Sequence, residues 1–67
     1  MELHKLSPTQ RQMFDGFLSN FRRCWGDFTP VSVEPCHDAA NGSYLRFVFD
    51  AQGRRHWLHV VGPETWY

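Results

Sequence analysis

Apolar residues recur every three or four positions between Pro8 and Trp25, which predicts one amphipathic helix over residues 8–25. At about 100° per residue, its apolar side chains fall within an arc of roughly 140°. They are Met13, Phe14, Phe17, Leu18, Phe21, Cys24 and Trp25. Ser7 and Gln10 form a capping box, Pro8 suits the first helical position, and Gly26 suits the stop. We expect the apolar arc to pack on a sheet.

Alternation of apolar and polar residues after the helix predicts three strands. They lie at about residues 31–36, 43–50 and 54–61. Pro35 cannot donate to a ladder, so the first of these strands belongs at a sheet edge. Pro63 likewise predicts that the tail, residues 62–67, leaves the sheet. The predicted fold class is α+β: one N-terminal helix on a three-stranded antiparallel β-meander, with residues 1–67 forming a single small domain.

The hairpin formed by the last two strands carries apolar side chains on both faces. A turn at Asp50-Ala51-Gln52-Gly53 followed by a bulge pairs Phe49 with Arg55 and Phe47 with Trp57. One face then presents Leu45, Phe47, Phe49, Trp57, His59 and Val61, and the other presents Tyr44, Arg46, Val48, His56, Leu58 and Val60. We expect the helix to cover the first face. The second face is then a candidate binding surface.

The register of the first strand has two solutions. A two-residue turn at Asn41-Gly42 places Val31 and Val33 on the Tyr44 face, whereas a loop longer by one residue places them on the Phe47 face. The sequence does not choose between them. The second sheet face has a simpler alternative to partner binding, since Leu3 and the Trp66-Tyr67 tail can fold over it and cover it.

Composition narrows the function classes. Six Phe, three Trp and two Tyr supply enough apolar surface to order a chain this short. Seven basic and seven acidic residues cancel, which disfavours a general polyanion binder. No apolar run is long enough for a membrane span or a signal peptide, so we expect a cytoplasmic location and reduced thiols. Whether Cys24 and Cys36 pair is left open.

The sequence contains only weak signals for catalytic groups. Cys36-His37-Asp38 contains the residue types of a thiol triad, but neighbours on an extended segment point apart. Histidines and cysteines are present without the spacing of a metal site, and no glycine-rich phosphate loop occurs. We therefore expect no enzymatic activity, no metal and no cofactor.

These features favour a small non-enzymatic protein-binding module, a regulator or inhibitor that docks on a larger protein, by analogy with accessory proteins of phages and mobile elements. Self-association as a homodimer is the simplest use of the spare face. The predicted partner-binding residues are Tyr44, Arg46, Val48, His56, Leu58, Val60, Trp66 and Tyr67. The alternative is a nucleic-acid-binding module that uses sheet aromatics with Arg22, Arg23, Arg46, Arg54 and Arg55.

Overall fold

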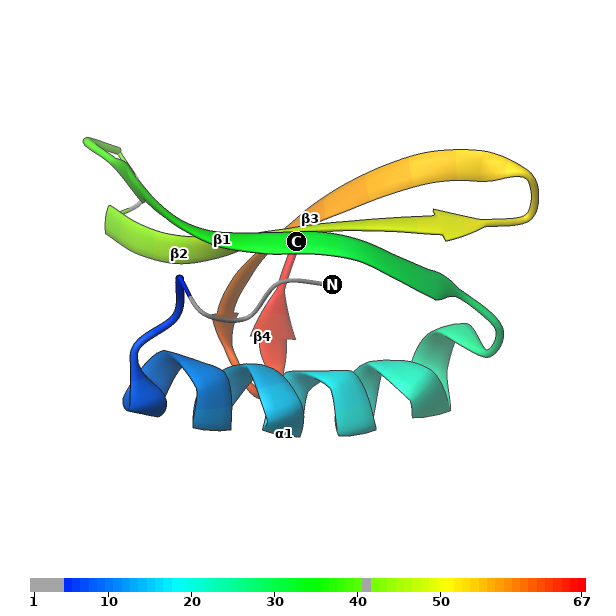
Figure 1. The fold of residues 1–67 in the computed structure, drawn as a ribbon, viewed down its shortest axis with the longest axis horizontal. Helices are drawn as coiled ribbons and strands as arrows, with labels where there is room; N and C mark the ends of the chain where they lie inside the picture. Colours follow the sequence, from blue (N-terminus) through cyan, green and yellow to red (C-terminus); the bar gives the residue numbers. More distant parts are fainter. Residues whose placement is uncertain (1–4, 41) are drawn as a thin grey trace.

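A helix lies across one face of an antiparallel sheet in the computed structural model, which describes residues 5–40 and 42–67 (Figure 1). The elements are α1 (Pro8–Trp25), β1 (Thr29–Asp38), β2 (Gly42–Ala51), β3 (Arg54–Gly62) and β4 (Thr65–Trp66). The strand order is β1-β2-β3-β4. The predicted α+β class and the α-β-β-β arrangement of the three main strands are confirmed, and β4 is an addition to them.

Helix α1 begins and ends where its capping signals predict. The backbone N–H of Gln10 donates to the Ser7 hydroxyl at 3.1 Å, and the Gln10 side chain accepts from the Ser7 N–H at 2.9 Å. At the other end, Gly26 adopts φ 90° and its N–H donates to the Arg22 carbonyl at 3.3 Å. Both ends therefore satisfy backbone groups that a helix otherwise leaves unpaired.

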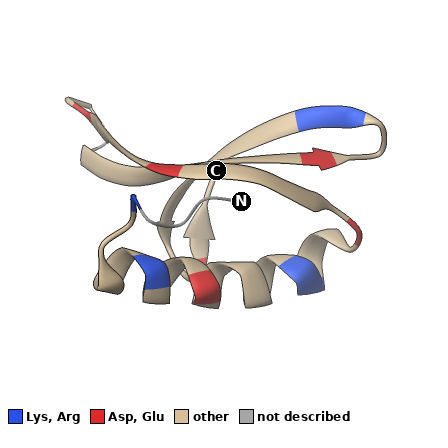
Figure 2. Cartoon of the chain, viewed as in Figure 1, with Lys and Arg blue, Asp and Glu red and all other residues tan. Residues whose placement is uncertain are grey.

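Phenylalanine rings fill the space between helix and sheet. Phe14 and Phe17 meet Phe47 of β2 edge to face, with ring centroids 5.3 Å and 5.4 Å apart. The buried residues are Leu6, Phe14, Phe17, Phe21, Val33, Leu45, Phe47, Phe49, Ala51 and Val60. Charged residues lie along the helix and at the tip of the β2–β3 hairpin (Figure 2). Among the described residues, none that is polar or charged is buried.

Two members of the predicted apolar arc are exposed, whereas Met13 and Leu18 are partly buried and pack against the core. Cys24 is exposed, and Trp25 keeps 40% of its surface exposed although its ring contacts Phe21, Phe49 and His56. Both residues lie in the last helical turn, and Cys24 also lies near the margin of the arc. Periodicity shows which side of a helix is apolar, but not how far along its length the helix packs against the sheet.

The predicted hairpin register is wrong by one residue. Gln52 and Gly53 have φ of 54° and 75°, the positive values of a two-residue type I′ turn, so no bulge forms. Phe47 pairs with Leu58, and Phe49 pairs with His56. Because adjacent strand residues point to opposite faces, this one-residue difference exchanges the two faces of β3 entirely.

The structure also decides the register of β1. Val33 lies opposite Phe47 and is only 3% exposed, so it faces the helix, as the longer of the two predicted loops requires. Asp38 pairs with Gly42 at the end of the ladder. The predicted tight turn includes Asn41, which lies outside the described residues, as does Leu3. Strand β1 is an edge strand, as Pro35 predicted, and it continues through that proline.

The prediction that the tail leaves the sheet is wrong. Pro63 lies in the turn between β3 and β4 rather than in a ladder, so its missing N–H does not prevent pairing. Trp66 pairs with Val60, and the backbones of Tyr67 and His59 exchange two hydrogen bonds of 2.8 Å and 3.0 Å. The tail therefore extends the sheet.

Three contacts hold this tail against α1. The Asn20 side-chain amide donates to the Pro63 carbonyl at 2.8 Å. Gly16 faces the same turn, and a Cβ at that position would lie 3.1 Å from the Cβ of Pro63. The Trp66 ring meets Phe17 edge to face at 5.2 Å. The absence of a side chain at Gly16 thus permits a close approach between the helix and the turn.

Candidate partner-binding face

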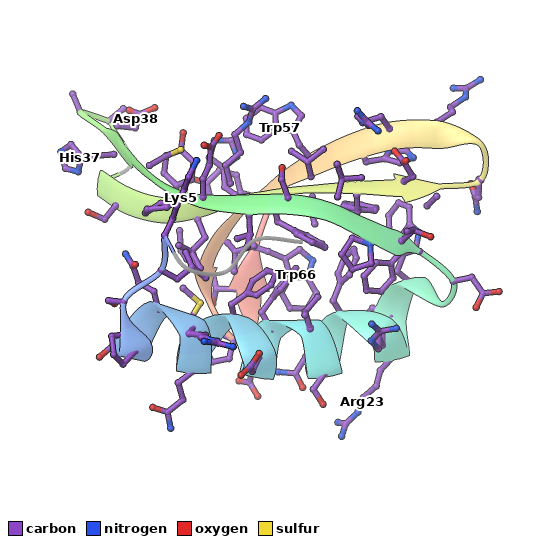
Figure 3. All side chains as sticks on the ribbon, viewed as in Figure 1. Lys5, Arg23, His37, Asp38, Trp57 and Trp66 are labelled. Carbon is purple, nitrogen blue, oxygen red and sulfur yellow. The ribbon has the colours of Figure 1, made fainter. Side chains whose placement is uncertain are left out.

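The sheet face that points away from α1 carries a set of aromatic and charged side chains that we call the open face. Trp57 points away from the helix, whereas Trp66 lies between sheet and helix (Figure 3). Trp57 is 47% exposed and Tyr67 is 54% exposed. The open face consists of Glu34, Tyr44, Arg46, Val48, Asp50, Arg55, Trp57, His59, Val61 and Tyr67.

The aromatic rings of the open face cluster around His59. The centroid of its ring lies 4.6 Å from that of Tyr44, 4.7 Å from that of Trp57 and 4.5 Å from that of Tyr67. The planes of His59 and Tyr67 differ by only 11°, so these two rings turn their faces toward each other. Strands β2 and β3 and the residue that follows β4 thus contribute to one cluster of rings in contact.

Each of two arginines on this face has an acidic neighbour. Arg46 lies 3.6 Å from a carboxylate oxygen of Glu34, and its guanidinium lies 5.1 Å from the centre of the Trp57 ring. Arg55 donates two hydrogen bonds to Asp50, at 3.0 Å and 3.3 Å. These bonds hold the pKa of Asp50 below its usual value and raise that of Arg55. The face is therefore aromatic and charged but locally neutral.

The Tyr44 hydroxyl remains protonated at neutral pH. Burial raises its pKa above the usual 10.0, and the neighbouring Cys36 and Asp38 raise it further. A phenol beside a charged, half-buried sheet surface can donate a hydrogen bond to an incoming group as well as accept one.

The structure separates the predicted partner-binding residues into two layers. Tyr44, Arg46, Val48 and Tyr67 lie on the open face. His56, Leu58 and Val60 lie on the helix side instead, because of the corrected register of β3. Val60 is fully buried, and Leu58 is partly buried and packs against the core.

Trp66 and His56 are held within the fold itself. The Trp66 ring contacts Phe17 and Phe21. His56 stacks on Phe49 with centroids 5.3 Å apart and meets Trp25 edge to face at 5.5 Å. Its Nε2 atom is buried and has no hydrogen-bond partner among the described residues. Both rings thus pack against the fold and are only partly exposed.

The arginines of the nucleic-acid alternative do not form one surface. Arg46 and Arg55 belong to the open face, whereas Arg54, at the start of β3, lies on the other side of the sheet. Arg22 and Arg23 lie in the last turn of α1. A hollow of about 500 Å³ lies between Arg22 and the hairpin turn, and Asp27 and Asp50 line it as well. Acidic side chains thus interrupt the basic groups at this end of the molecule.

Trp57 and His59 occupy the places on the open face that the sequence pattern predicted for Leu58 and Val60. Both alternating sets of β3 contain apolar and polar residues, so periodicity does not choose between them. The deciding signal lies in the turn. A two-residue type I′ turn usually has Asn or Asp before its glycine, and here Gln52 holds that position, which makes the signal weak.

The residues of the candidate thiol triad lie on two different faces of β1. Cys36 and Asp38 share one face of β1, whereas His37 points to the other and its Nδ1 lies 3.3 Å from the Ser43 hydroxyl. Both cysteines are free. Within residues 5–40 and 42–67, no group of three or more His, Cys, Asp or Glu side chains is placed to hold a metal ion. No helix in those ranges is long and apolar enough to cross a membrane.

Comparison with protein families, with curated proteins and with solved structures gives no match.

Proposed function

We propose that this chain is a non-enzymatic module that docks on a larger protein through the open face and thereby regulates or inhibits it. The observation that carries the proposal is the exposure of Trp57, 47%, beneath the guanidinium of Arg46 on the sheet face away from the helix. Trp, Tyr and Arg are the residue types that dominate binding energy at protein interfaces. A cytoplasmic site of action fits the two free cysteines.

Charge pairing favours a protein partner over a nucleic acid. A phosphate backbone is bound mainly by unpaired cations. On the open face, however, Arg46 lies beside Glu34 and Arg55 is bonded to Asp50, so phosphate would have to displace a carboxylate. A protein surface can instead satisfy both members of such a pair at the rim of an interface.

The arrangement of the rings supports the same choice. Single-stranded nucleic acids are bound by aromatic faces on which bases stack. His59 and Tyr67 stack on each other, and one side of Trp57 is occupied by Arg46. The cluster offers a partner apolar ring surface, a Tyr44 hydroxyl and charged groups, which is typical of a protein interface.

Two tryptophans with similar exposure permit a matched test of this proposal. Trp57→Ala removes the centre of the open face, whereas Trp25→Ala removes a ring that is 40% exposed at the end of α1. We expect Trp57→Ala to weaken capture of the partner from cells of the native host at least about 30-fold, the size of an interface hot spot, and Trp25→Ala to leave capture unchanged. Capture is quantified by mass spectrometry on variants whose folding has been verified.

Equal capture by both variants would refute docking through the open face. A salt-sensitive shift of single-stranded nucleic acid that disappears in Trp57→Ala would reassign the face to nucleic acid. A concentration-dependent dimer in light scattering that Trp57→Ala abolishes would make a second copy of the chain the occupant.

A further inference from the structure

Strand β4 covers only part of the free edge of β3. Its two residues pair with Val60 and Gly62, and Tyr67 continues the pairing as far as His59. No described strand accompanies β3 from Arg54 to Leu58 on that side. The strand therefore has one paired edge along its length and a second edge that is half open.

Backbone groups point outward along this open half. In an antiparallel ladder, the N–H and C=O of alternate residues point to the same side. His59 directs both groups to Tyr67, on the side away from β2. Trp57 and Arg55, two and four residues earlier, must then direct theirs the same way. Four backbone hydrogen-bonding groups, two from each residue, are thus presented in the geometry of a ladder.

The two outer edges of the sheet differ in their protection. Strand β1 contains Pro30 and Pro35, and its pairing is interrupted by an irregularity between Pro30 and Ser32. Prolines and bulges are devices that keep an edge from pairing with another chain. The open half of β3 contains no proline and is flanked by the exposed side chains of Arg54 and Arg55.

The positive charge of the β3 edge favours an acidic strand over a second copy of the chain as its pairing partner. A second copy that paired with this edge in antiparallel fashion would bring Arg54 and Arg55 of both copies into one short ladder, and like charges across a ladder destabilise it. Arg55 is already bonded to Asp50, whereas Arg54 is exposed on the other side of the strand. A strand with acidic side chains would be attracted by the charge of Arg54, whereas a second copy would be repelled by it.

We propose that the edge from Arg54 to Leu58 accepts an extended acidic segment of the partner protein, which adds to the sheet as a further strand in line with β4. The segment would pair with the backbones of Arg55 and Trp57, and because the Trp57 side chain belongs to the open face, both surfaces would contact one partner. Strand addition of this kind derives affinity from main-chain hydrogen bonds. The proposal rests on the proposed function for the existence of that partner.

Amide hydrogen exchange measured by NMR tests the edge with a defined probe. The probe is an acetylated, amidated peptide of alternating Glu and Val, and the control peptide has Lys in place of each Glu. In the free protein, we expect the amides of Arg55 and Trp57 to exchange rapidly and that of His59 slowly. At about 1 mM, the Glu peptide should slow exchange at Arg55 and Trp57 about fivefold and the Lys peptide less than twofold.

Two variants separate the backbone contribution from the charge contribution. The chain is short enough for chemical synthesis, so the Trp57 N–H can be replaced by an ester oxygen with every side chain retained. Loss of one main-chain hydrogen bond should weaken binding of the Glu peptide about 5- to 10-fold. Arg54→Glu should reverse the preference, so that the Lys peptide gives the stronger protection.

Several results would overturn the strand-addition proposal. They are equal protection by both peptides, protection by neither, and slow exchange at Arg55 and Trp57 in the free protein, which would show that the edge is already paired. These results are independent of the capture experiment. Trp57-dependent capture without peptide protection would support docking through the open face and refute strand addition. Peptide protection without Trp57-dependent capture would support strand addition and refute docking through the open face.

Discussion

The two faces of the sheet use aromatic residues in different ways. Toward the helix, Phe47 and Phe49 are fully buried and meet other phenylalanines edge to face. On the opposite face, the rings belong to Tyr, Trp and His, and Trp57 and Tyr67 remain about half exposed. Phenylalanine offers only apolar surface, whereas the other three rings combine an apolar body with a polar tip. The inner face thus stabilises the fold, and the outer face can exchange water for a partner.

Strand β2 shows this division most simply. Leu45, Phe47 and Phe49 alternate with Tyr44, Arg46 and Val48, so from Tyr44 to Phe49 the strand has one apolar side and one mixed side. A change on one side should therefore affect stability, and a change on the other should affect binding. Each prediction below tests that separation.

The largest expected effect is on the inner face. Phe47→Ala removes a fully buried ring that contacts five other phenylalanines, and we expect it to lower the free energy of unfolding by about 3–5 kcal/mol. Trp57→Ala on the outer face should cost about 1 kcal/mol or less. Urea unfolding followed by circular dichroism measures both. Equal losses would mean that the open face also stabilises the fold.

A smaller effect of opposite sign is expected at His56, the polar ring on the inner face. Its Nε2 is buried without a partner among the described residues, and its ring stacks on Phe49. His56→Phe keeps the stacking and removes the cost of the unpaired nitrogen, so we expect the free energy of unfolding to rise by about 1 kcal/mol.

His59→Phe on the open face is the matched control for His56→Phe, and it should change stability by less than about 0.5 kcal/mol. Thermal unfolding of the two variants and the parent at one pH provides the comparison. A destabilised His56→Phe would indicate that the imidazole makes a favourable interaction that its present contacts do not reveal.

The smallest effect concerns the exposed Asp50–Arg55 pair. The pKa of Asp50 lies below its ordinary 3.8 because Arg55 donates hydrogen bonds to the carboxylate. The pair therefore contributes stability above that ordinary value and loses it as the pH falls through the lowered pKa. Arg55→Gln should shift the urea midpoint slightly at pH 7 and less at about pH 2, because the carboxyl loses its charge as the pH falls through its lowered pKa. The same shift at both pH values would contradict this account.

The helix and the strand order followed from local signals. Ser7, Pro8 and Gln10 determine where the helix starts, and Pro35 placed its strand at an edge. These features depend on residues within a few positions of each other. Sequence reasoning therefore succeeded for the fold class and for the bounds of α1.

The composition of the binding face depended on a contact that alternation does not encode. Leu58 and Trp57 both have side chains suited to a core, and the two-residue turn at Gln52-Gly53 sets the register in which Leu58 faces the helix. Trp66 was expected on the binding surface and instead lies on the helix side, because Pro63 marks a turn here rather than the end of the sheet. Tertiary packing against Phe17 then held the returning strand.

The Gln52-Gly53 turn has only two residues, and its length determines which side chains of β3 face solvent. Insertion of a single residue there would turn β3 by half a rotation relative to β2. The Trp57 indole would then be buried against the helix, and Leu58 and Val60 would be exposed to water. A lineage that gained or lost one codon at this hairpin would thus change its recognition chemistry without altering any side chain that takes part in it.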